Sequence, residues 1–93
     1  MSLPTRLTDD EIRERLAAVP GWELQGAEIR RTYRFSDFVA ALAFVNRVGV
    51  LAEAAAHHPD IDIRYSRVTL ALTTHEAGGL TARDFELAAQ IRA

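Results

Sequence analysis

The sequence contains no cysteine, which excludes disulfide bonds and metal sites built from thiolates. It contains no lysine either: all 11 basic residues are arginine, which we interpret as a bias of genome composition and not as chemistry. No apolar run is long enough to span a bilayer, and the N-terminus has no signal-peptide core. Glycine loops of the nucleotide-binding kind are also absent, since Gly78-Gly79 fits neither common pattern. We therefore expect a cytoplasmic protein without a phosphate-binding loop.

The remaining composition is that of one small globular domain over residues 1–93. Hydrophobic residues make up 48% of the chain, which is too many for a disordered segment. The formal net charge is −2, and acidic and basic residues are interspersed, so we expect neither a nucleic-acid surface nor a membrane surface. Because the core of so short a chain is modest, association with further copies would add stability.

Hydrophobic spacing, capping residues and turn residues predict the element order α-β-β-α-β-β-α. Capping-box patterns open the first helix at Thr8 and the last helix at Thr81, with Glu11 and Asp84 three residues further on. Alternating segments predict two hairpins, one over residues 22–35 and one over residues 60–75, the second turning at Ser66-Arg67. Consecutive hairpins favour a four-stranded antiparallel sheet with helices packed on one face, an α+β two-layer domain.

The central helix is expected to run from Ser36, as its N-cap, to about His57, because Pro59 disfavours helical geometry at His58. Three apolar residues lie off its main stripe and leave more apolar surface than one helix face needs, which predicts a subunit interface: Val39, Phe44 and Leu51. The stripe expected to be buried consists of Phe38, Ala41, Leu42, Val45, Val48, Gly49 and Ala52.

All three histidines fall at predicted ends of elements: His57 and His58 where the central helix ends, and His75 where the last strand ends. Glu53 lies four residues before His57, so the two would share one helix face. An exposed pair of this kind contributes only a few tenths of a kcal/mol, and histidine is also a common residue at a helix C-terminus, so a purely structural role stays open. Three imidazoles without a nucleophile favour proton transfer near neutral pH over covalent catalysis.

A three-histidine zinc site is a rival interpretation. Adjacent histidines tend to point apart, and the usual H-x-x-x-H spacing is absent, so we expect no metal. Two further polar or aromatic residues have ordinary explanations. Asp84 fits the capping box, and Trp22 fits either the core or the wall of a pocket.

The spaced set Glu53-x-x-x-His57-His58-Pro59, Tyr65, His75 and Asp84 resembles the signature of the pterin-4a-carbinolamine dehydratase family. The flanking pieces Gly21-Trp22, Phe35-x-x-Phe38 and Thr74-His75-Glu76 resemble it too, and the likeness covers nearly the whole chain. The resemblance implies the fold order given above and assembly into a homodimer or homotetramer.

The resemblance also implies a lyase activity, the dehydration of a 4a-hydroxytetrahydropterin to quinonoid dihydropterin and water. The substrate arises when an aromatic amino acid hydroxylase uses its tetrahydrobiopterin-type cofactor, so the enzyme would support cofactor recycling. No metal and no organic cofactor would be needed, because the pterin is the substrate.

The resemblance assigns roles to particular residues. His57 and His75 would form the acid–base pair, and His58 would hold or polarise the pterin ring. Glu53 and Asp84 would orient the imidazoles. The remaining substrate contacts would come from Thr73, Thr74, Glu76 and Trp22.

A second hypothesis is a dehydratase-like binding or regulatory protein, because animal relatives also act as dimerisation cofactors of a transcription factor. Retention of all three histidines favours the enzyme. A third hypothesis is an imidazole enzyme acting on another cyclic substrate.

Overall fold

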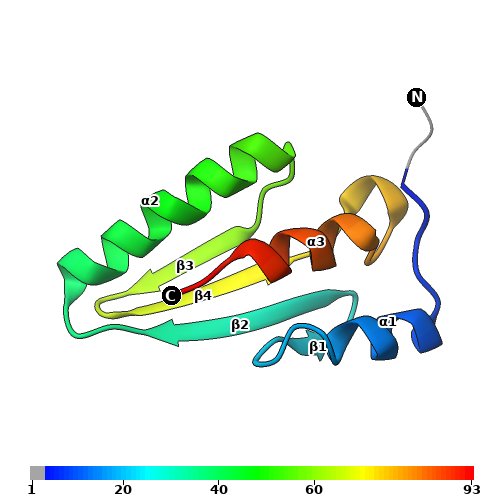
Figure 1. Cartoon of the computed structure of the whole chain (residues 1–93), viewed down its shortest axis with the longest axis horizontal. Helices are drawn as coiled ribbons and strands as arrows, with labels where there is room; N and C mark the ends of the chain where they lie inside the picture. Colours follow the sequence, from blue (N-terminus) through cyan, green and yellow to red (C-terminus); the bar gives the residue numbers. More distant parts are fainter. Residues whose placement is uncertain (1–3) are drawn as a thin grey trace.

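A computed structural model describes residues 4–93, so the first three residues of the expected domain lie outside the described part (Figure 1). The expected order α-β-β-α-β-β-α is confirmed, with one added 3-10 helix between the last strand and the last helix. The elements are α1 (Asp9–Leu16), β1 (Glu23–Gln25), β2 (Glu28–Arg34), α2 (Phe38–Ala55), β3 (Asp60–Arg64), β4 (Arg67–Leu72), η1 (His75–Ala77) and α3 (Ala82–Gln90).

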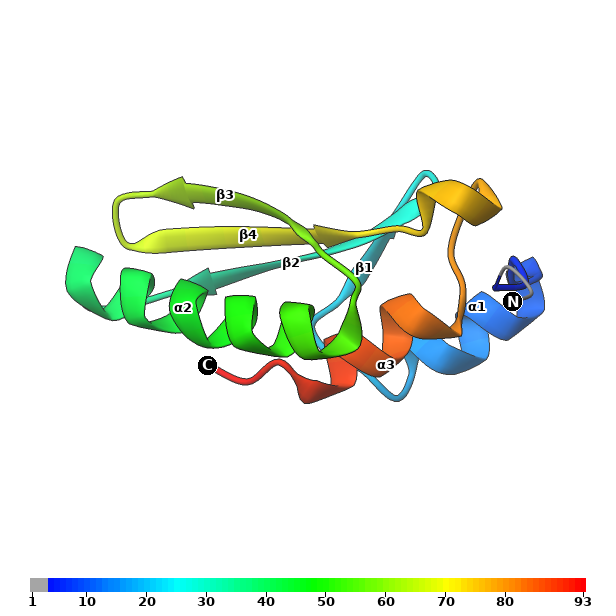
Figure 2. The same cartoon turned by 90° about the horizontal axis from the view of Figure 1, so that it is seen from above.

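The strands form one antiparallel sheet in the order β1-β2-β4-β3. Figure 2 shows α1, α2 and α3 on the same side of this sheet, which confirms the two-layer α+β arrangement. Alternation along β4 places Val68, Leu70 and Leu72 on the helix side, and each is fully buried. The opposite face of the sheet carries no helix among the described residues and is polar.

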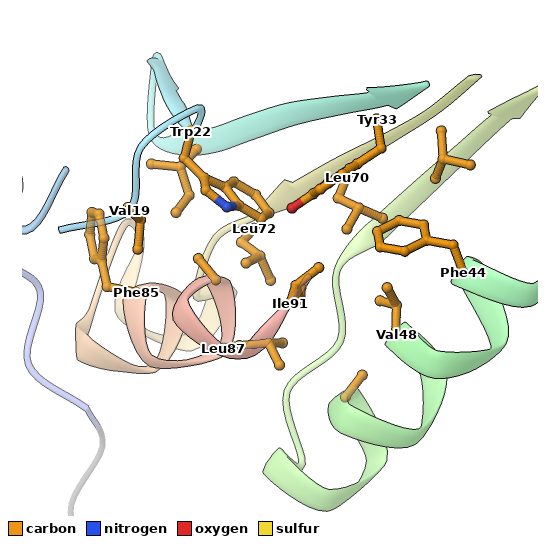
Figure 3. Close-up of a cluster of buried hydrophobic side chains, with 14 of the residues drawn as sticks. Val19, Trp22, Tyr33, Phe44, Val48, Leu70, Leu72, Phe85, Leu87 and Ile91 are labelled. Atoms are coloured by element: carbon orange, nitrogen blue, oxygen red, sulfur yellow. The ribbon is translucent and has the colours of Figure 1, made fainter. Parts of the chain in front are cut away.

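The core lies between the sheet and the helices (Figure 3). Phe44 on α2 is fully buried and packs against the Tyr33 ring from β2, with ring centroids 4.5 Å apart. Trp22 meets Tyr33 edge-on, with centroids 6.5 Å apart. Aromatic residues from α2, from β2 and from the segment before β1 therefore join the two layers.

Both predicted capping boxes are confirmed, at Thr8 with Glu11 and at Thr81 with Asp84. Other boundaries differ by a residue or two. The N-cap of α2 is Asp37, not Ser36, because the Asp37 carboxylate accepts from the Ala40 N–H at 2.8 Å. The turn between β3 and β4 uses Tyr65-Ser66 instead of Ser66-Arg67, and Tyr65 takes a left-handed φ of 52°.

The buried face of α2 is rotated from the predicted one. Phe44, expected off the buried stripe, is fully buried, whereas Phe38 and Leu42 remain 45% and 38% exposed. The residues that are buried on this helix are Ala41, Phe44, Val48 and Ala52. Apolar spacing alone could not fix the rotation, because α2 is apolar on most of its circumference.

The same helix corrects the expectation about membrane spans. α2 has 18 residues with a mean hydropathy of 1.6, so by length and composition it could cross a membrane. Its buried residues pack on the sheet, as the core helix of a globular domain does. Phe38, Val39, Leu42 and Val50 remain exposed on it. Of the three residues predicted to form a subunit interface, only Val39 is well exposed, because Phe44 is buried and Leu51 is half-buried. A subunit interface on this helix stays a prediction.

Candidate active site

The end of α2 separates the two adjacent histidines. Ala56 follows the helix in the left-handed conformation, with φ 51° and ψ 38°. Its N–H bonds to the Glu53 carbonyl at 3.2 Å, and the N–H of His57 bonds to the Ala52 carbonyl at 3.1 Å. This pair of bonds is the Schellman motif that closes many helix C-termini. The helix therefore ends before His57. His57 and His58 lie in the turn that follows it.

The side chain of His57 points into the domain and meets Asp84 from the first turn of α3. Nε2 of His57 lies 2.6 Å from Oδ1 of Asp84. His57 is 8% exposed, and Asp84 is fully buried. A buried imidazole thus faces a buried carboxylate, in a geometry that holds the ring in one orientation.

Asp84 is held in turn by two threonines through its second oxygen. Oδ2 accepts from the Thr74 hydroxyl at 2.9 Å and from the Thr81 N–H at 2.9 Å. The hydroxyls of Thr74 and Thr81 lie 2.8 Å apart, and both residues are fully buried. Capping and pairing with an imidazole were alternative explanations for Asp84, and the residue does both, one with each oxygen.

His58 points away from this group. Its Nε2 pairs with the Glu53 carboxylate on the surface of α2, where both side chains are well exposed. The expected pairing of Glu53 with His57 is therefore wrong. Helical i, i+4 spacing no longer applies beyond the left-handed Ala56, which brings the next histidine back over the helix.

His75 begins η1, and its side chain is exposed. The segment is closed by reciprocal backbone bonds between Thr74 and Gly79, at 3.1 and 3.3 Å. Since His75 directly follows Thr74, the contact of Thr74 with Asp84 brings the His75 segment beside the His57 group. Glu76 on η1 is exposed. Thr73 is half-buried and donates its hydroxyl to the Ala27 carbonyl at 2.6 Å.

Trp22 lies in the core and not beside the histidines. It is 5% exposed and lines a hollow of about 410 Å³ with Val19 and Ile91, toward the C-terminal end of α3. Its indole N–H and the Tyr33 hydroxyl are buried without a hydrogen-bond partner among the described residues, and Figure 3 shows the Tyr33 hydroxyl pointing toward the Trp22 ring. Burial raises the pKa of Tyr33, and the nearby Arg31 guanidinium partly offsets this.

Eight of the nine predicted site residues lie at or just after the end of α2, between β4 and η1, on η1, or at the start of α3. Only Trp22 lies elsewhere. Within residues 4–93, no three His, Asp or Glu side chains converge as metal ligands would. Thr81 was predicted only as a helix cap. Its hydroxyl also belongs to the buried group, and a capping box beside a histidine-rich turn is the one sequence signal that could have indicated this.

Comparison with known proteins identifies a family. Residues 5–93 match the family model described as pterin 4 alpha carbinolamine dehydratase. A protein of Acidobacterium capsulatum, provisionally named pterin-4-alpha-carbinolamine dehydratase, is 65% identical over 95% of this chain and 96% of its own length. A protein of Roseiflexus sp. with the same provisional name is 61% identical over 96% of each chain.

Solved structures give the same assignment. The crystal structure of a transcriptional coactivator/pterin dehydratase from Brucella melitensis has a TM-score of 0.89 and 36% identity, covering 94% of this chain and 95% of that one. A pterin dehydratase-like protein, described as a RuBisCO assembly factor in the alpha-carboxysome, shares the fold at a TM-score of 0.66 and 21% identity, covering 80% of this chain and 88% of that one. By its sequence and by its fold, the chain belongs to the pterin 4 alpha carbinolamine dehydratase family.

Proposed function

We propose that the protein dehydrates a 4a-hydroxytetrahydropterin to quinonoid dihydropterin and water. The reaction needs a proton delivered to the C4a hydroxyl as the C–O bond breaks, and a proton removed from N5. Paired general acid and base groups supply both. The observation that supports the proposal is that two histidines at the end of α2 have carboxylate partners, and that Asp84 links one of them to Thr74, next to the third.

Burial suggests which imidazoles reach the substrate. A catalytic ring must touch the reacting atoms, and His57 is 8% exposed with one nitrogen on Asp84. The His58 side chain is 61% exposed, and His75 is exposed as well. We therefore assign the acid and base roles to His58 and His75 in place of the earlier pair His57 and His75. Glu53 would orient His58, and His57 would hold the turn that presents it.

Other parts of the proposal rest on the family alone. The reaction would proceed without a metal or organic cofactor and would recycle the pterin used by an aromatic amino acid hydroxylase. Thr73 and Glu76 flank the His75 segment and would contribute contacts to the pterin. The protein would work in the cytoplasm as a homodimer or homotetramer.

A regulatory or assembly role is the second candidate. It is favoured by the apolar residues Phe38, Val39 and Leu42 that α2 leaves exposed. Two proteins of similar structure, described as a transcriptional coactivator/pterin dehydratase and as a RuBisCO assembly factor, also support this candidate. Val39→Asp would abolish such binding, whereas the histidine variants would leave it unchanged.

The test is stopped-flow absorbance of freshly generated 4a-hydroxytetrahydropterin. Wild-type protein should accelerate dehydration, and His58→Ala and His75→Ala should each lower kcat by roughly 10²- to 10⁴-fold. Arg13→Ala on the exposed surface of α1 is the control and should leave kcat unchanged. If well-folded wild-type protein gives no acceleration, the dehydratase proposal fails and the regulatory role takes its place.

A further inference from the structure

The buried group around Asp84 is a hydrogen-bond chain whose direction can be worked out donor by donor. An ionised carboxylate has no hydrogen to give, so the Thr74 hydroxyl must donate to Oδ2 of Asp84. A hydroxyl has only one hydrogen, so Thr74 must accept from Thr81 across their 2.8 Å contact. The Thr81 oxygen in turn accepts from the N–H of Arg83 at 3.3 Å.

The same reasoning fixes the other end of the chain. Oδ1 of Asp84 can only accept, so Nε2 of His57 must carry the hydrogen in their 2.6 Å contact. In the neutral ring, Nδ1 is then the nitrogen without a hydrogen. Hydrogens are therefore donated in one direction along the chain, from Arg83 to Thr81, from Thr81 to Thr74 and from Thr74 to Asp84. His57 donates to the other oxygen of Asp84.

We propose that Thr74 is a positioning residue that couples the two halves of the site. Its hydroxyl fixes the Asp84 carboxylate and, through it, the Nε2-protonated tautomer of His57. Its backbone pairs with Gly79 and thereby fixes the segment that begins with His75. Thr74 is fully buried, so it acts through these contacts and not by touching substrate, which replaces the substrate-binding role implied for it by resemblance.

The tautomer is tested on the wild-type protein by nitrogen-detected NMR of the His57 ring near neutral pH. The expected result is one slowly exchanging hydrogen on Nε2 and none on Nδ1 in the neutral ring. A hydrogen on Nδ1 would overturn the proposal. This measurement does not depend on any activity, so it can fail or succeed separately from the dehydratase proposal, on which the kinetic test below rests.

The coupling is tested by replacing the hydroxyl. Thr74→Val keeps the shape of the side chain and removes the donor to Asp84, and we expect the His57 Nε2 hydrogen to exchange faster and kcat to fall about 10- to 100-fold, the scale of small misplacements in an active site. KM should change little, because Thr74 does not touch substrate. Thr74→Ser restores the hydroxyl and should recover both signals. Unchanged kcat and unchanged exchange in Thr74→Val would refute the coupling.

Thr69→Val is the matched control. Thr69 on β4 likewise has a hydroxyl that meets another threonine, Thr32, at 2.9 Å, but on the opposite face of the sheet, which carries no helix among residues 4–93. The Thr69→Val substitution should leave kcat and the NMR signals of the His57 ring unchanged. If Thr74→Val does not fold, Thr74→Ala replaces it, since the smaller side chain cannot clash and still lacks the hydroxyl. The same two outcomes then decide the proposal.

Discussion

Replacing the two adjacent histidines by alanine, one at a time, should lower stability by very different amounts. His57→Ala leaves the buried Asp84 without its imidazole partner. Breaking a buried pair from one side costs about 3–5 kcal/mol. Because Oδ2 keeps its hydrogen bonds from Thr74 and Thr81, we expect a value near the lower end, about 3 kcal/mol. At about 4–8 °C per kcal/mol for a domain of this size, Tm should fall by roughly 12–24 °C.

His58→Ala is the matched control, since it removes the same side chain one position further on. Its pair with Glu53 is exposed, and exposed pairs contribute about 0–1 kcal/mol. Urea unfolding measures both losses at equal protein concentration through the fluorescence of Trp22, the only tryptophan, which is buried. Equal losses in the two variants, or a loss below about 1 kcal/mol for His57→Ala, would refute the argument from burial.

Three further substitutions test other parts of the structure. Tyr33→Phe removes a buried hydroxyl without a partner among residues 4–93, so the free energy of unfolding should rise by about 1 kcal/mol. Because burial raises the pKa of Tyr33, the wild type should also lose stability as pH rises above 10 and through that pKa, and the variant should not. A marked loss of stability in the variant at neutral pH would contradict this account. Hydrogen bonds from Thr8 hold the pKa of Glu11 below its usual 4.5, so Glu11 stabilises the fold above pH 4.5 and ceases to do so as pH falls through the lowered pKa. A pH series of thermal melts should show the wild type more stable than Glu11→Gln at neutral pH and equally stable in acid. A difference in Tm that stays constant with pH would contradict this prediction. Ala56→Gly relieves a left-handed φ of 51° and should raise stability by about 1 kcal/mol, whereas Ala54→Gly inside α2 should lower it by about 0.5–1 kcal/mol; thermal melts with shifts of the same sign would show that Ala56 is not strained.

Local patterns predicted the local structure well. Thr8 with Glu11 and Thr81 with Asp84 form the capping boxes that their spacing indicates. Alternation along β4 correctly predicted its buried face. The contacts of a capping box join residues only three positions apart, so the local sequence determines them. The alternation along β4 determines its buried face because only one side of the sheet faces the core.

Features set by packing could not be predicted in the same way. Phe44 is buried because the rings of Tyr33 and Phe35 lie 4.5 and 5.0 Å from it across the layer, which no spacing along α2 reveals. The strand order, in which β4 lies between β2 and β3, likewise depends on how the two hairpins meet. The contact of Thr74 with Asp84 is invisible for the same reason, since it joins η1 to α3.

The pairing of carboxylates with histidines turned on one residue. A Schellman motif usually has glycine at its left-handed position, and that glycine is the signal by which a helix end is found in a sequence. Here Ala56 occupies the position, so the sequence pattern predicts a helix that continues to about His57 and a pairing of His57 with Glu53. Because the chain instead turns at Ala56, His57 enters the core to meet Asp84, and His58 returns to Glu53. The tendency of adjacent histidines to point apart, which counted against zinc, thus divides this pair into a buried ring that supports the turn and an exposed ring that can meet a substrate.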